Sequence, residues 1–117
     1  VNYLYDPVEP AFLKIIGTAI KTANNHGKPL SICGEMAGNP FHALLLVGLG
    51  LRRFSVVPRN IPILKELISR ISFAEASESV SHADAITSTA EMAQWLTTLN
   101  KRVFGSALQN LPLTADV

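Results

Sequence analysis

The chain of 117 residues contains a single cysteine, and only 16% of its residues are charged, with a formal net charge of +1. One cysteine excludes an internal disulfide framework and a cysteine-based zinc cluster, and it fits a reducing cytoplasm. The basic pairs Arg52–Arg53 and Lys101–Arg102 are isolated, so charge gives no basis for binding nucleic acid or an anionic membrane. We interpret both pairs as parts of solvated helix faces.

Long apolar runs are also lacking. The longest, Ala43 to Gly50, is far shorter than the roughly 18–20 residues that span a bilayer, and the N-terminus has no signal-peptide layout. The sequence therefore predicts a cytoplasmic protein without a membrane segment. Hydrophobic residues nevertheless make up 48% of the chain, and the mean hydropathy is +0.26. We expect this excess to form surface for another subunit or for a missing part of the same domain.

Apolar spacing and capping residues predict the order helix, strand, helix, strand, helix, helix, helix. The predicted elements are a helix over 6–25, a strand over 30–33, a helix over 39–47, a strand over 54–57, and helices over 60–71, from 72, and over 88–104. The first helix has a predicted apolar face of Phe12, Ile15, Ile16, Ala19, Ile20 and Ala23. The last is predicted to turn Met92, Trp95, Leu96, Leu99 and Val103 inward.

Alternating strands and helices indicate a βαβ unit with a parallel sheet, which is the α/β class. Two strands cannot form a sheet that is buried on both faces, and a complete (β/α)8 barrel takes eight strands and about 250 residues. The chain begins at Val1 rather than at a methionine. We therefore interpret residues 1–105 as a fragment of a larger domain and residues 106–117 as a tail.

The segment Cys33–Gly38 lies where a predicted strand gives way to a predicted helix. A thiol at the carboxyl end of a buried strand, followed by small residues and a helix N-terminus, is how α/β enzymes present a reactive side chain to a small anion. The alternative is a packed cysteine, because cysteine is among the most buried residue types. Gly34 and Gly38 either allow close backbone approach or let the chain turn. His42 is a weaker candidate as a base for the thiol, because no third orienting residue is evident.

This pattern resembles the C-terminal part of phosphoenolpyruvate-protein phosphotransferase, Enzyme I of the bacterial phosphotransferase system. The resemblance covers roughly two thirds of the chain. The blocks that carry it are Leu4-Tyr5-Asp6, His26-Gly27-Lys28, Cys33 to Gly38, Leu44 to Gly50, Phe54-Ser55, Ile61-Pro62 and Phe73 to Ala76. Two positions depart from the family's pattern. Asn39 stands where the family usually has an acidic residue, and Arg52–Arg53 stands where the Enzyme I of sugar transport has acidic residues. The basic pair makes the chain look more like the nitrogen-related paralogue.

The resemblance implies that strands 30–33 and 54–57 are the last two strands of a phosphoenolpyruvate-binding TIM (β/α)8 barrel. It implies that Cys33 is the catalytic acid that protonates C3 of the pyruvate enolate, with Gly34 and Glu35 near the substrate. It also implies Mg2+ as a cofactor, a histidine phosphocarrier protein as a partner, and a homodimer. The phosphorylated histidine, the Mg2+ ligands and the substrate-binding arginines would lie before Val1, so we expect the chain alone to turn over no substrate.

A thiol suits this step because the acid must hold its proton at neutral pH and still release it readily, whereas a carboxylic acid is normally ionised there. The negative charge of Glu35 would tend to keep a neighbouring thiol protonated. A structural role for Glu35, bonded to backbone or to an arginine elsewhere, is at least as well supported.

The alternative function is a non-catalytic module derived from that barrel, which self-associates or docks on a partner through its apolar surface. Open sheet edges predict self-association under either interpretation. A thiol-based redox sensor is disfavoured, because the chain has no second cysteine and no basic cluster near Cys33.

Overall fold

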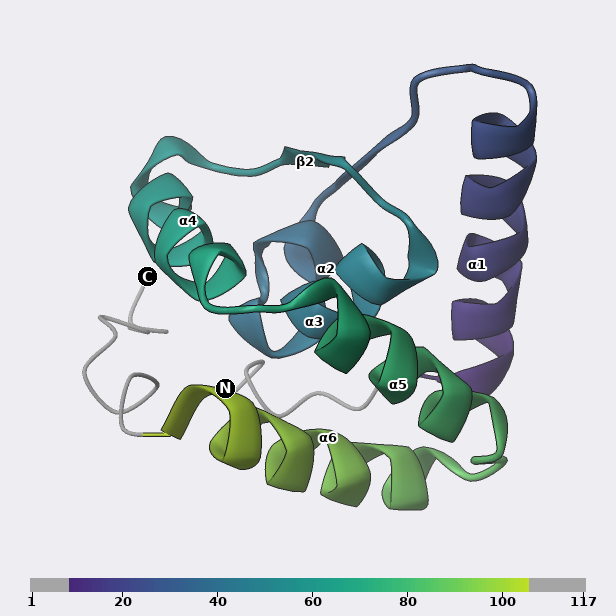
Figure 1. The fold of residues 1–117 in the computed structure, drawn as a ribbon, viewed down its shortest axis with the longest axis vertical. Coiled ribbons are helices and arrows are strands. Elements are labelled where there is room, and N and C mark those ends of the chain that lie inside the picture. The colour runs from purple at the N-terminus through teal and green to yellow at the C-terminus, as the bar shows by residue number, and fades with distance from the viewer. Residues whose placement is uncertain (1–8, 106–117) are drawn as a thin grey trace.

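The computed structural model describes residues 9–105, and in that range helices pack against one face of a small sheet (Figure 1). The predicted tail over 106–117 and the start of the predicted first helix lie outside the described residues. The elements are α1 (Pro10–Asn25), β1 (Ser31–Cys33), α2 (Glu35–Gly38), α3 (Pro40–Leu49), β2 (Arg53–Ser55), the 3-10 turn η2 (Pro58–Asn60), α4 (Ile61–Ser69), α5 (Phe73–Asp84) and α6 (Thr89–Phe104). The predicted order is confirmed, with α2 and η2 as short additions.

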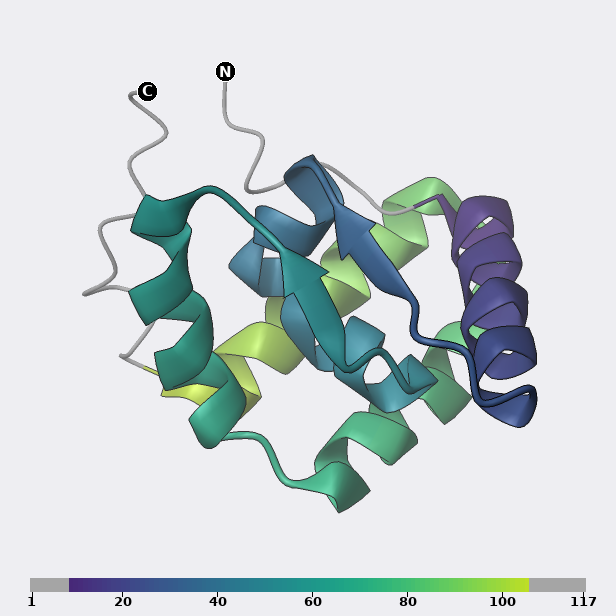
Figure 2. The ribbon, with the colours of Figure 1, turned by 90° about the horizontal axis from the view of Figure 1, so that it is seen from above.

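The two strands pair in parallel, which confirms the α/β class and the βαβ unit. Each strand is one residue shorter than predicted, since β1 begins at Ser31 instead of Leu30 and β2 runs over 53–55 instead of 54–57. The central residues Ile32 and Phe54 are register partners, and both are half-buried against the helices. Figure 2 shows the strands side by side between α1 and α4, with no element of residues 9–105 drawn over the near face of the sheet.

Helix α3 is the centre of the molecule. Its sequence is apolar on all sides, and such a helix is stable only when it is surrounded. Residues 43–46 are completely buried, and Leu44, Leu45 and Leu46 each belong to a different hydrophobic cluster. Leu44 packs with Ala76 and Leu99, Leu45 with Met92 and its neighbours, and Leu46 with Ile20 and Leu51.

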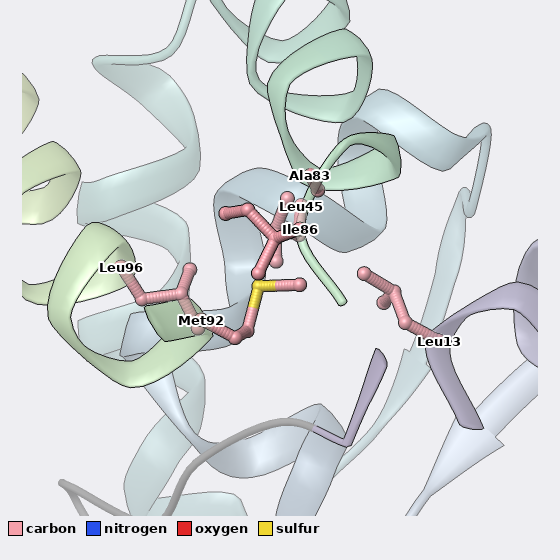
Figure 3. Packing of buried hydrophobic residues seen from close by; sticks show 6 residues of the cluster. All are labelled: Leu13, Leu45, Ala83, Ile86, Met92 and Leu96. Carbon is pink, nitrogen blue, oxygen red and sulfur yellow. The ribbon is translucent and has the colours of Figure 1, made fainter. Parts of the chain in front are cut away.

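The cluster around Leu45 joins four helices (Figure 3). Leu13 reaches it from α1, Ala83 from α5, and Met92 and Leu96 from α6. The thioether of Met92 lies at the centre of this group, where a flexible and polarisable side chain fits an irregular gap. The predicted inward face of α6 is therefore confirmed, with Trp95 and Val103 half-buried at its edges.

The predicted apolar face of α1 is wrong in part. Leu13 and Ile20 are buried, but Phe12 is 51% exposed and Ile15 is 65% exposed. Helix α1 packs against α3 along the line of Leu13, Ile16 and Ile20, so Phe12 and Ile15 lie outside that contact. The apolar arc of α1 is wider than the described chain covers, which is typical of a helix that has a second neighbour.

Side-chain capping bonds form at the N-termini of α5 and α6 but not at that of α4. At α5 the Ser72 side chain accepts from the Glu75 N–H at 3.1 Å, and the Glu75 carboxylate accepts from the Ser72 N–H at 3.2 Å. Ser88 accepts from the Glu91 N–H in the same way at α6. Asn60, at the start of the helix predicted over 60–71, makes no side-chain capping bond, because the η2 turn sets its backbone in the helical region.

The basic pair Arg52–Arg53 does not lie on a solvated helix face, so that interpretation is wrong. The guanidinium of Arg52 donates to the carbonyl oxygens of Val47 at 3.1 Å and Leu51 at 3.0 Å, at the C-terminus of α3. A cation there satisfies carbonyls that the helix leaves without intrahelical donors. Arg53 is the first residue of β2.

Candidate active site

Cys33 is the last residue of β1, and its side chain is exposed. Its thiol therefore does not belong to the core of the described chain, in contrast to the packing expected of most lone cysteines. The strand end and the exposure together match the predicted position of a reactive thiol. Carboxyl ends of parallel strands are also where α/β enzymes place their reacting groups.

One face of the sheet is polar and open. Partners in a parallel pair point their side chains to the same face, and alternate residues of a strand share a face. The register partners are Ser31 with Arg53 and Cys33 with Ser55, and all four are exposed. Cys33 and Ser55 are the carboxyl-terminal residues of their strands, so a thiol and a hydroxyl stand side by side at this end of the face.

Gly34 turns the chain sharply after Cys33. Its φ of +85° and ψ of −162° lie in a region that only glycine populates readily. An added Cβ at Gly34 would meet nothing within 4 Å, so the turn, and not a close backbone approach, explains this glycine. The helix that follows at once is α2, whose first turn closes with the Gly38 N–H donating to the Gly34 carbonyl oxygen at 3.1 Å. The expectation that the next helix begins at Asn39 missed this short helix.

The end of this segment contacts the loop after β2. Gly38 has no Cβ, and an added one would lie 3.1 Å from Nδ2 of Asn60, so this glycine leaves room for the Asn60 side chain. Asn39 follows with its side chain buried and its backbone extended. The connections that follow the two strands therefore meet at Gly38 and Asn60.

The remaining predicted site residues divide by position. Glu35 opens α2 directly after Gly34, and the structure does not describe its side chain. His42 is buried in the first turn of α3, while Cys33 is exposed on the sheet. His26 caps the C-terminus of α1, and His82 stacks on Trp95 with ring centroids 6.2 Å apart.

Two further features of the described residues lie apart from Cys33. A groove of about 780 Å3 runs between α1, α3 and α5, with Leu45 and Leu49 among its apolar lining and Lys14, Lys21 and Asp84 among its polar lining. Among the side chains that the structure describes over residues 9–105, a set that leaves out Glu35, no three His, Cys, Asp or Glu are grouped so as to hold a metal ion. These described side chains do not by themselves form an Mg2+ site.

No helix among residues 9–105 is both long enough and apolar enough to cross a membrane.

Ser55 is the site residue that sequence reasoning missed. Its only signal was the Phe54-Ser55 block, and nothing in that block shows that it lies opposite Cys33.

Comparison with known proteins agrees with this geometry. The family described as "PEP-utilising enzyme, PEP-binding domain" matches residues 1–73, which include both strands and the Cys33 turn. A phosphoenolpyruvate-protein phosphotransferase of Buchnera aphidicola is 39% identical over 83 residues, which is 71% of this chain and 14% of the relative. Those of Cupriavidus necator and Bacillus subtilis are 44% identical over 68 residues and 35% identical over 96 residues, covering 58% and 82% of this chain.

The chain spans only between 12% and 17% of the length of these three relatives. The match is nevertheless continuous through β1, α2, α3 and β2, which are the elements that form the site. The chain belongs to the PEP-binding domain family of PEP-utilising enzymes, as a C-terminal part of a phosphoenolpyruvate-protein phosphotransferase.

Proposed function

We propose that this chain provides the proton donor of a phosphoenolpyruvate-protein phosphotransferase, and that the donor is Cys33. The observation that carries the proposal is the exposed thiol at the carboxyl end of β1, inside the segment that matches the family. The names of the relatives support phosphoenolpyruvate as the substrate. The nitrogen-related paralogue is proposed as the branch on the basic pair Arg52–Arg53.

The two strands are proposed to be neighbours in an eight-stranded barrel whose other strands come from outside this chain. A parallel sheet is normally covered on both faces, and here one face is exposed. In such a barrel the face with Cys33 and Ser55 would line the interior at its catalytic end. The half-buried face with Ile32 and Phe54 already packs on the helices, as in the outer layer of a barrel.

The proposed chemistry begins when phosphoenolpyruvate gives its phosphoryl group to a histidine outside this chain and leaves the enolate of pyruvate. The electron pair of the enolate C2–C3 double bond then takes the proton of the Cys33 thiol. A C3–H bond forms, the S–H bond breaks, and the products are pyruvate and a thiolate, which regains its proton from water. In the reverse direction the thiolate removes a proton from the methyl group of pyruvate.

Other parts of the machinery would come from outside this chain. Mg2+, proposed as the cofactor of the full-length enzyme, would stabilise charge on the transferred phosphoryl group. The next phosphoryl acceptor is proposed to be a histidine phosphocarrier protein, the enzyme a homodimer, and its compartment the cytoplasm. Gly34 and Glu35 remain proposed neighbours of the substrate, because α2 places their backbone directly after Cys33.

One observation favours the second candidate function, a non-catalytic docking or self-associating module. Phe12 and Ile15 expose apolar surface on α1. This surface is also expected in the enzyme, where the rest of the protein would cover it. The two functions therefore differ in what they require of Cys33.

The test is the Cys33→Ser variant of the full-length enzyme that carries this segment. The serine hydroxyl is too weak an acid to replace the thiol, so we expect pyruvate formation to fall by at least about 100-fold. Phosphoenolpyruvate binding, measured by calorimetry, should stay within about twofold. Unchanged pyruvate formation would contradict the proposed role of Cys33 and leave the docking module as the better account.

A further inference from the structure

Ser55 lies directly opposite Cys33 in the parallel register. Adjacent strands are about 4.8 Å apart, so the two Cα atoms are next neighbours across the sheet. Both side chains are exposed and belong to the same face. From this juxtaposition we infer that Ser55 is a positioning residue for Cys33, and the inference rests on the proposed function of that thiol.

A serine hydroxyl can donate one hydrogen bond and accept two, whereas a thiol is only a weak donor and a weak acceptor. Before proton transfer, the hydroxyl of Ser55 can accept from the thiol and orient it. After transfer, the same hydroxyl can turn and donate to the thiolate. One rotatable group thus serves both states of Cys33 without a movement of the backbone.

The backbone beneath this pair is well anchored, as a positioning role requires. Ile32 precedes Cys33 and Phe54 precedes Ser55, and both pack against the cluster of Ile20, Leu46 and Leu51. The spacing of the two exposed side chains is therefore set by the core. Small errors in the placement of a reacting group cost large factors in rate, so such anchoring is useful at an acid.

Ser31 provides a matched control on the same face. It is also an exposed serine, but it lies two residues before Cys33 on β1 and pairs with Arg53. Two residues along a strand correspond to about 6.6 Å, which is beyond hydrogen-bonding reach of the thiol for so short a side chain. Removal of this hydroxyl tests whether any serine on the face matters, or only the register partner of Cys33.

The experiment compares Ser55→Ala, Ser55→Thr, Ser31→Ala and Cys33→Ala in the full-length enzyme that carries this segment. For Ser55→Ala we expect kcat for pyruvate formation to fall about tenfold with KM for phosphoenolpyruvate within about twofold, because positioning acts on the chemical step. Threonine keeps the hydroxyl, so Ser55→Thr should recover most of kcat, and Ser31→Ala should behave as the unaltered enzyme. A thermal melt identifies any variant that fails to fold.

The outcomes separate the inference from the proposed function. If Cys33→Ala is inactive while Ser55→Ala keeps full kcat, the positioning role is wrong and the acid stands. If Ser31→Ala loses as much kcat as Ser55→Ala, the effect does not depend on register, and the inference is also overturned. Full activity of Cys33→Ala would instead overturn the proposed function itself. If Ser55→Ala fails to fold, Ser55→Thr provides the test. Unaltered kcat in a soluble Ser55→Thr variant supports the positioning role of the hydroxyl, and a tenfold loss of kcat contradicts that role.

Discussion

At the scale of single residues, glycine shapes the site through two different physical effects. Gly34 is needed for its backbone conformation, because φ of +85° with ψ of −162° is unfavourable for any residue with a Cβ, even though the space around it is open. Gly38 is needed for space, because Asn60 lies against it. Both effects act within a few residues of Cys33.

The Gly34→Ala variant should therefore destabilise the protein through its backbone alone, by about 1–3 kcal/mol in the free energy of unfolding. Urea denaturation of the full-length enzyme or of the chain, followed by circular dichroism, measures this. Gly27→Ala is the comparison, since Gly27 has φ of +64° and also has open space around it. Its cost should be smaller, about 1 kcal/mol, and an equal cost for both would contradict a special demand at Gly34.

The residue scale also shows what local patterns can and cannot predict. Cys33 at the end of a strand follows from apolar residues that precede it and small residues that follow. Ser55 could not be recognised in the same way, because neither strand's own sequence shows the register in which the two strands pair. The paired residues Cys33 and Ser55 are 22 positions apart along the chain. The four residues of α2 are too few for a helical period, so they were also missed.

At the scale of elements, the close packing of α3 on α5 depends on Gly48. A Cβ at this position would lie 2.2 Å from the carbonyl oxygen of Ala76, which is backbone and cannot move aside. Gly17 of α1 is also a helical glycine, but its added Cβ would lie 3.1 Å from Cδ2 of Leu49, a flexible side-chain atom. Gly48→Ala and Gly17→Ala are therefore the same residue change within a helix, and the two variants differ in what the added Cβ meets.

We expect Gly48→Ala to lower the free energy of unfolding by about 1–3 kcal/mol through overpacking, or to prevent folding. Gly17→Ala should be near neutral, because alanine gains up to about 1 kcal/mol of helix propensity over glycine while Leu49 shifts slightly. Thermal melts of the two variants test this directly. A Gly48→Ala variant that is as stable as Gly17→Ala would show that α3 and α5 are not packed this closely.

A second element-scale prediction concerns the capping box of α5. Ser72→Ala removes the acceptor of the Glu75 N–H and should cost about 1 kcal/mol of stability. Ser81→Ala on the exposed side of α5 is the control and should stay within about 0.5 kcal/mol. Chemical denaturation of both variants measures the difference, and equal effects would argue against a stabilising cap.

These elements show why the positions of the helices were predicted more completely than which of their side chains are buried. The box at Ser72 and Glu75 and the stop at Gly105 are local, so the sequence contains the whole signal. The burial of α1 is not local. Phe12 and Ile15 continue its helical period, but they are 51% and 65% exposed and lie outside the contact with α3, which a helical period alone does not predict.

At the scale of the whole molecule, the chain is an incomplete α/β unit. Within residues 9–105 the sheet has two strands, so each strand has one edge without a partner strand. The exposed apolar side chains of α1 add to this surface. Both features explain the high apolar content that the sequence shows.

The chain alone should therefore self-associate at micromolar concentration. Light scattering should give an apparent mass above that of one chain, and Ile15→Lys on the exposed face of α1 should lower it. Thr98→Lys adds the same charge at an exposed position of α6 and should leave the mass unchanged. If the unaltered chain is a monomer at this concentration, that result contradicts the expectation that its exposed apolar surface binds a partner.

The central claim is that Cys33 moves a proton to and from C3 of pyruvate. The most direct measurement follows deuterium entry from D2O into the methyl group of pyruvate by NMR, with the full-length enzyme at equilibrium between phosphoenolpyruvate and pyruvate. We predict exchange with unaltered Cys33 and a loss of at least about 100-fold in the Cys33→Ala variant, because no other group then removes the proton. Exchange at the same rate in both proteins would contradict the account and assign the acid to another residue.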